Sequence, residues 1–146
     1  MYTFEHNVFI NRPTQEVFDY VTQPSNAPKW QGTVESAEWV SDGPVGVGST
    51  WRGVNKFMGR KIEGTLEITS WDPPNEHSFK AAGGPVPFEN TWTFEDKDDG
   101  TQVTMSGQAE LGGFFKLAEG MVGKQMDKQM ETDLANLKRM LEAGEA

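Results

Sequence analysis

Apolar and polar residues alternate along several short stretches of this chain. In residues 3–10, apolar side chains and His6 occupy every second position, and polar side chains such as Glu5 lie between them. This period of two predicts a strand that buries one face. Strand signals between clusters of Gly, Pro, Asp and Asn predict six more strands, at residues 33–41, 49–57, 60–71, 77–82, 88–95 and 101–109.

One predicted hairpin shows which side chains share a face. The strands on either side of Met58-Gly59 meet if Phe57 pairs with Arg60, and paired residues point to the same side of a sheet. With this register, and with the same alternation along the later strands, one set of residues is expected to face inward. The set is Trp51, Gly53, Asn55, Ile62, Gly64, Leu66, His77, Phe79, Ala81, Phe88, Asn90, Trp92, Phe94, Val103, Met105 and Gly107.

Helical signals occur after the first strand and at the C-terminal end. Pro13 suits the first turn of a helix and Pro24 ends it, after which a second short helix ends near Trp30. Apolar residues spaced by three or four predict one long amphipathic helix over about residues 113–142. Such a helix is about 45 Å long, and two glycines weaken its first half by about 1 kcal/mol each relative to alanine.

Composition and charge narrow the class of protein. The chain has 146 residues, and we expect residues 1–146 to form a single domain. Its 13 basic and 22 acidic residues give a net charge of −9, which argues against binding to nucleic acid or to an anionic membrane surface. The absence of Cys excludes disulfides and thiolate metal sites. No signal peptide and no membrane-spanning stretch are present, so we expect a cytoplasmic protein without stable membrane insertion.

Together these elements predict an α+β fold. A curved seven-stranded antiparallel sheet wraps around the long C-terminal helix, and two short helices follow the first strand. The sheet has one face that needs cover, which the C-terminal helix is long enough to provide. The inward side chains are large, while Gly53, Gly64 and Gly107 leave gaps beside them. We therefore expect a mostly apolar cavity between sheet and helix, with a fully packed core as the alternative.

Several short segments stand in an order and spacing typical of one superfamily: residues 10–13 (Ile-Asn-Arg-Pro), 17–20 (Val-Phe-Asp-Tyr), 28–30 (Pro-Lys-Trp), 41–48, 71–74 (Trp-Asp-Pro-Pro), 100–101 and 134–141. In these segments the chain resembles the START-like superfamily, also called SRPBCC, in its polyketide cyclase/dehydrase branch. The resemblance implies the helix-grip fold with a deep hydrophobic cavity. It implies ligand binding more strongly than any one reaction, since members include lipid carriers, cyclases and binding proteins.

The side chains expected to bind a ligand are those that the predicted facing turns toward this cavity. Two of them are amides, which either orient a polar group of the ligand or bond to backbone or trapped water. The predicted ligand-binding residues are Trp30, Trp51, Asn55, Leu66, Phe79, Phe88, Asn90, Trp92, Phe115, Val122 and Met126.

Catalysis is the principal alternative to binding alone. His6 and His77 are the two histidines, and both fall on the inward face, where either could transfer a proton near neutral pH. The first hypothesis is a binding protein for a lipid, polyketide or other aromatic or isoprenoid molecule. The second is a cyclase or dehydratase without metal that uses the same cavity, and the third is a protein-interaction module.

The expected partner in the first two hypotheses is a small hydrophobic molecule, bound by a monomer or weak homodimer. No cofactor is expected. No zinc or calcium ligand pattern occurs in the sequence. The glycine-rich segment 43–48 leads into a strand instead of a helix, so it does not resemble a phosphate-binding loop.

Overall fold

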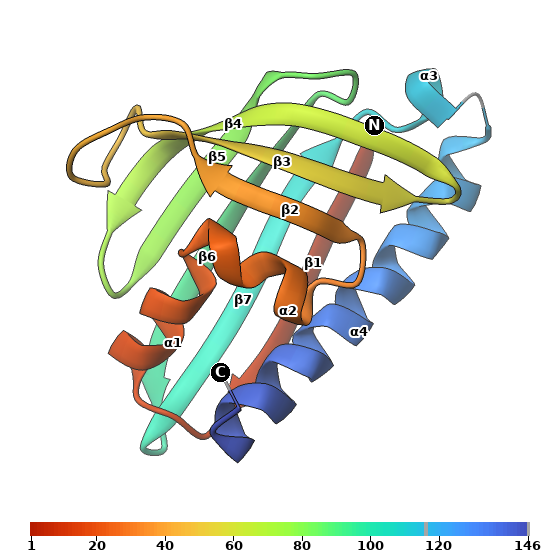
Figure 1. Cartoon of the computed structure of the whole chain (residues 1–146). Coiled ribbons are helices and arrows are strands. Elements are labelled where there is room, and N and C mark those ends of the chain that lie inside the picture. Colours follow the sequence, from red (N-terminus) through yellow and green to blue (C-terminus); the bar gives the residue numbers. More distant parts are fainter. Residues whose placement is uncertain (116, 146) are drawn as a thin grey trace.

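The computed structural model describes residues 1–115 and 117–145. Its seven strands form one antiparallel sheet in the order β1-β7-β6-β5-β4-β3-β2, which curls over a long C-terminal helix (Figure 1). The strands are β1 (Tyr2–Ile10), β2 (Val34–Trp39), β3 (Thr50–Phe57), β4 (Arg60–Asp72), β5 (Glu76–Gly83), β6 (Phe88–Lys97) and β7 (Gly100–Ala109). The helices are α1 (Thr14–Val21), the 3₁₀ turn η1 (Pro24–Asn26), α2 (Ala27–Trp30), α3 (Gly112–Phe115) and α4 (Glu119–Ala143).

The predicted fold class is confirmed, and so is the register of the predicted hairpin. In β3 and β4, Phe57 pairs with Arg60 and Trp51 pairs with Leu66. The two residues between the strands, Met58 and Gly59, have φ angles of 51° and 76°. Positive φ at both central residues is typical of the tight turns that match the twist of a hairpin.

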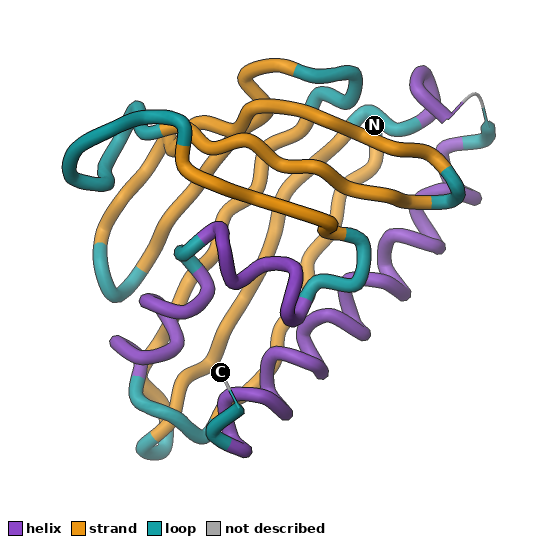
Figure 2. The backbone as a smooth tube through the Cα atoms, viewed as in Figure 1, coloured by secondary structure: helices purple, strands orange, loops and turns teal. Residues whose placement is uncertain are grey.

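The short helix α1 closes one end of the curled sheet because its apolar side chains pack on the rings of the strands. Phe18 is 1% exposed. Its ring lies 5.2 Å from the ring of Trp71 in β4 and 5.2 Å from that of Phe94 in β6. Figure 2 shows α1, α2 and α4 on the same concave side of the sheet. Each strand has one apolar face, and helices on that side of the sheet bury it.

The prediction of one helix over residues 113–142 is wrong at its first end. The structure has the short α3 and then α4, whose preceding residue Ala118 has an extended ψ of 126°. Because α3 is separate from α4, Phe115 can pack on Phe57 at the far end of β3, where the ring centroids are 5.7 Å apart. The 25 residues of α4 are about 37 Å long. Within the described residues, no helix is long and apolar enough to cross a membrane.

The buried side chains form two clusters. The first joins α1, α2 and the C-terminal half of α4 to the sheet, and it contains Phe18, Trp92 and Leu137. The second joins the end of β3 to α3 and the first turn of α4, and it contains Phe57 and Val122. The cavity described below is lined by members of both clusters, so the interior is not packed continuously from end to end.

The expected gap at Gly107 is wrong, and at Gly64 backbone fills the place of a side chain. A Cβ atom on Gly107 would lie 2.1 Å from the carbonyl oxygen of Glu89 and 2.8 Å from the ring of Phe4. A Cβ on Gly64 would lie 2.6 Å from the carbonyl oxygen of Gly83. Backbone or a neighbouring ring already occupies the position of each Cβ, so both glycines permit close approach of chain segments. Gly64 also lines a smaller pocket of about 60 Å³. Gly53, in contrast, does line the cavity.

Candidate ligand-binding cavity

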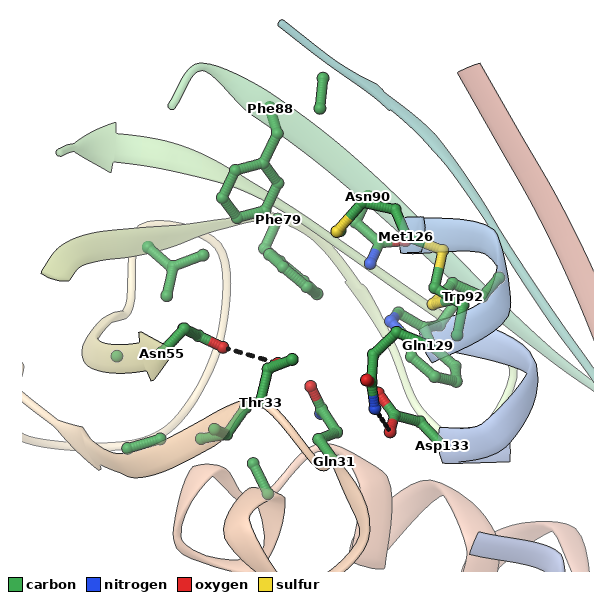
Figure 3. A pocket seen from close by; sticks show the side chains of 18 of the residues that line it. Gln31, Thr33, Asn55, Phe79, Phe88, Asn90, Trp92, Met126, Gln129 and Asp133 are labelled. Carbon is green, nitrogen blue, oxygen red and sulfur yellow. Dashed lines mark hydrogen bonds between the residues drawn. The ribbon is translucent and has the colours of Figure 1, made fainter. Parts of the chain in front are cut away.

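A cavity of about 270 Å³ lies between the sheet, α2 and α4. Its walls are mostly apolar, because β3 to β6 contribute one face of each strand and α4 contributes its inward stripe. Figure 3 shows Phe79 and Phe88 on one side and Met126 and Trp92 on another. For scale, an apolar cavity of about 150 Å³ in a protein interior holds one benzene molecule. The volume therefore suits a bicyclic ring system or a compact chain of similar size.

Most of the side chains predicted to bind a ligand line this cavity. They are Trp30, Trp51, Asn55, Leu66, Phe79, Phe88, Asn90, Trp92, Phe115 and Met126. Val122 does not line it, so its predicted place is wrong. It is completely buried in the second cluster, where the start of α4 packs closely on its neighbours.

Several polar lining residues were not predicted. Gln129 and Asp133 of α4 lie on the cavity side of the helix, and Gln31 and Thr33 come from the segment between α2 and β2. The signal for the first two was present, because residues 126, 129 and 133 follow the helical spacing of three and four. Gln31 and Thr33 lie in an irregular segment, where no periodicity indicates direction.

Asp133 connects α4 to the segment that follows α2. Its Oδ1 atom accepts a hydrogen bond from the backbone N–H of Gly32 at 2.9 Å and another from Nε2 of Gln129 at 2.8 Å. Burial raises the pKa of the Asp133 carboxyl above its ordinary value, and the two hydrogen bonds act in the opposite direction. Burial therefore outweighs the two hydrogen bonds in its effect on the pKa of this carboxyl.

Replacing Asp133 by Asn is expected to leave the free energy of unfolding at pH 7 unchanged or to raise it by up to about 1 kcal/mol. The amide oxygen still accepts both bonds, and the buried charge is gone. Asp133→Ala is expected to lower it by about 1–3 kcal/mol, because the Gly32 N–H loses its acceptor. Urea unfolding of both variants measures the difference. A large loss in Asp133→Asn would show that the charge itself stabilises the fold.

His77 lies at the wall of the cavity within a group of aromatic rings. Its side chain is 4% exposed, and its ring stacks on Phe79 with centroids 5.5 Å apart. Phe18 and Trp71 meet it edge-on. Neither ring nitrogen has a hydrogen-bond partner in the part of the chain that the structure describes. Burial lowers the pKa of His77 to about 4, so the imidazole is neutral at pH 7.

His6, the other catalytic candidate, is not among the residues that line the cavity. Its Nε2 lies 3.0 Å from Oδ1 of Asp127 in α4, and the Tyr2 hydroxyl donates to the same oxygen at 2.5 Å. Burial and this hydrogen bond raise the pKa of Tyr2. The group connects β1 to α4, so the structure gives His6 a place in the packing of helix on sheet.

The two predicted amides have different surroundings. Asn55 of β3 accepts a hydrogen bond from the Thr33 hydroxyl at 3.3 Å, as Figure 3 shows. The Oδ1 atom of Asn90 in β6 is buried without a partner among the described residues. Within residues 1–115 and 117–145, no three His, Cys, Asp or Glu side chains lie close enough together to share a metal ion.

A curled antiparallel sheet closed by a C-terminal helix over an internal cavity defines a START-like protein. A START superfamily protein from Mycobacterium smegmatis has the same fold, with a TM-score of 0.74 at 16% identity over 98% of this chain and 96% of that one. Residues 1–142 match the family described as polyketide cyclase/dehydrase and lipid transport, and the protein belongs to that family.

Two further proteins are similar over almost the whole chain. The structure of TTHA0849 from Thermus thermophilus has a TM-score of 0.81 at 25% identity, and the match covers 99% of both chains. The uncharacterised protein Rv2574 of Mycobacterium tuberculosis is 26% identical over 149 residues, which cover 97% of this chain and 86% of the relative. These similarities agree with the fold and do not name a ligand.

Proposed function

We propose that the protein binds a small hydrophobic molecule in the cavity between the sheet and α4. The observation that carries this proposal is the cavity of about 270 Å³ lined by aromatic and aliphatic side chains. Apolar surface removed from water contributes about 25 cal/mol per Å², so a bicyclic ligand or a short acyl or isoprenoid chain gains affinity from burial alone. Membership of a family that includes lipid transport supports the same function.

The proposal is tested by filling the cavity from one strand. Ala37 of β2 lines the cavity, while Ser36 is exposed on the other face of the same strand. We expect Ala37→Phe to weaken binding of 1-naphthalenemethanol by at least about 10-fold, because the added ring occupies ligand space. Ser36→Phe should change the affinity by less than about 2-fold, since it adds the same ring outside.

Fluorescence titration of both variants measures the affinities, and urea unfolding checks that each is folded. Equal affinities in Ala37→Phe, Ser36→Phe and the unsubstituted protein would place the probe outside the cavity and contradict the proposal. Mass spectrometry of small molecules retained through purification under native conditions then identifies the class of natural ligand. Monomer or weak homodimer remains our prediction for the assembly that binds it.

A cyclase or dehydratase activity is the second candidate, and the position of His77 favours it. His77 lines the cavity, and neither of its ring nitrogens has a partner among the described residues, so a bound ligand can hydrogen-bond to it. Its pKa of about 4 makes the neutral imidazole a weak base at pH 7, so a ligand must also stabilise the protonated ring for proton transfer. The contacts of His6 with Asp127 favour a structural role for that residue instead. Catalysis is distinguished from binding alone by His77→Phe, which must abolish turnover of a ketide substrate while the probe still binds.

The outer face of β3 and β4 gives little support to a protein-interaction module. Arg52 forms an ion pair there with Glu63 at 2.8 Å, and Lys61 lies 3.5 Å from the same side chain. Charged, solvent-exposed pairs of this kind do not form the contiguous apolar patch that marks a docking surface.

A further inference from the structure

Among the described residues that line the cavity, Asp133 is the one carboxylate. Its side chain is 8% exposed. Both of its hydrogen bonds end on Oδ1, and Oδ2 accepts none from the described residues. A buried carboxylate is normally balanced by a cation or saturated with hydrogen bonds. Oδ2 has neither, and because it is not among the completely buried side-chain atoms that lack a partner, it is in contact with open space.

The described lining contains no Lys or Arg, and no ion pair between described residues includes Asp133. The remaining titratable side chains of the lining are Tyr2 and the neutral His77. Burial is the largest cause of the raised pKa of Asp133, as expected for a carboxylate without a cationic partner. A ligand with a positive charge would therefore balance the negative charge of Asp133.

The neighbours of Asp133 are suited to a cation. Figure 3 shows Gln31, Gln129 and Asp133 on the same side of the cavity, where Gln129 donates a hydrogen bond to Asp133. Carboxylate and amide oxygens accept hydrogen bonds from an ammonium group. Trp30 and Trp92 also line the cavity and supply apolar surface for the rest of a ligand.

We propose that the ligand of this cavity is an apolar molecule that carries a protonated amine, which Asp133 binds. The proposal rests on the proposed binding function and names the class of ligand. The ammonium group donates to Oδ2 of Asp133, and the apolar part fills the aromatic region. The net charge of −9 favours the approach of a cation. A carboxylate ligand such as a fatty acid would place two anions in one apolar space.

Three probes of one ring system test the selectivity: 1-naphthylmethylamine, 1-naphthalenemethanol and 1-naphthoic acid, titrated at pH 7. We expect the amine to bind about 10-fold more tightly than the alcohol, because its hydrogen bond to the carboxylate is charge-assisted. The acid should bind at least about 10-fold more weakly than the alcohol. Asp133→Asn should remove the advantage of the amine and change the affinity for the alcohol by less than about 3-fold.

Glu131→Gln is the matched control, because it removes one negative charge from the exposed side of the same helix. It should retain the preference for the amine. An alcohol that binds as tightly as the amine, or an amine preference that survives in Asp133→Asn, overturns this inference and leaves the proposed binding function intact. Failure of all three probes to bind would overturn both.

Discussion

Gly107→Ala is expected to lower the free energy of unfolding by at least about 3 kcal/mol, or to prevent folding. Gly107 lies in β7, between β1 and β6. A Cβ atom there would stand 2.1 Å from the carbonyl oxygen of Glu89 and 3.0 Å from the Cα of Asn90, both in the backbone of β6. A backbone carbonyl cannot rotate away as a flexible side chain can. The two strands would have to separate where they form the floor of the cavity.

Gly83→Ala is the control for this substitution. Gly83 lies at the end of β5, it is exposed, and an added Cβ would meet no atom within 4 Å. We expect a change below about 0.5 kcal/mol in urea unfolding. Similar losses of stability for the two variants would show that close approach of β6 and β7 is not the reason Gly is required at position 107.

The second large effect is a dependence of stability on pH that arises from His77. Its folded-state pKa of about 4 lies below the ordinary value of 6.5. Between these two values the unfolded chain binds a proton that the folded chain does not bind. The free energy of unfolding therefore falls as the pH is lowered from 6.5 toward 4, and this one group accounts for a loss of about 2–3 kcal/mol by pH 4.5.

His77→Phe keeps an aromatic ring beside Phe79 and removes the titration. We expect urea unfolding of the unsubstituted protein to lose about 2–3 kcal/mol more than His77→Phe between pH 7 and pH 4.5. Carboxylates also titrate in this window, but they are the same in both proteins and cancel in the difference. Parallel losses in the two proteins would mean that the buried imidazole accepts its proton without penalty.

At pH 7 the same variant should be at least as stable as the unsubstituted protein, because both imidazole nitrogens lack partners among the described residues. A variant more stable than the unsubstituted protein would show that His77 contributes less to stability than an apolar ring, as is common for residues that act on a ligand at a cavity wall.

Much of the fold followed from local patterns. The pairing of Trp51 with Leu66 was predictable from one tight turn and the alternation on either side of it. The inward face of β6, with Phe88, Asn90 and Trp92, followed from the same alternation. Side-chain direction within a regular strand depends on the backbone alone, so the alternation of residues along each strand was sufficient to predict which side chains point inward.

The candidate site was predicted less completely, for three separate reasons. Asp133 was not predicted, because a charged residue at the edge of the apolar stripe of a helix normally faces solvent. Gln31 was missed because it lies in an irregular segment without periodicity. His6 faces inward as expected, but Asp127 of α4 meets it there, so inward direction alone did not place it in the cavity.

The amino-acid sequence alone determined which segments become strands, how β3 pairs with β4, which side of each strand turns inward and, apart from the break between α3 and α4, which segments become helices. These properties depend on contacts between residues close together in the chain. Tertiary structure decided which inward side chains meet a void and which meet one another. That outcome depends on the distance between the curled sheet and α4, which no local pattern records. The same inward direction therefore leaves Trp51 beside the cavity, while Val122 is packed solidly.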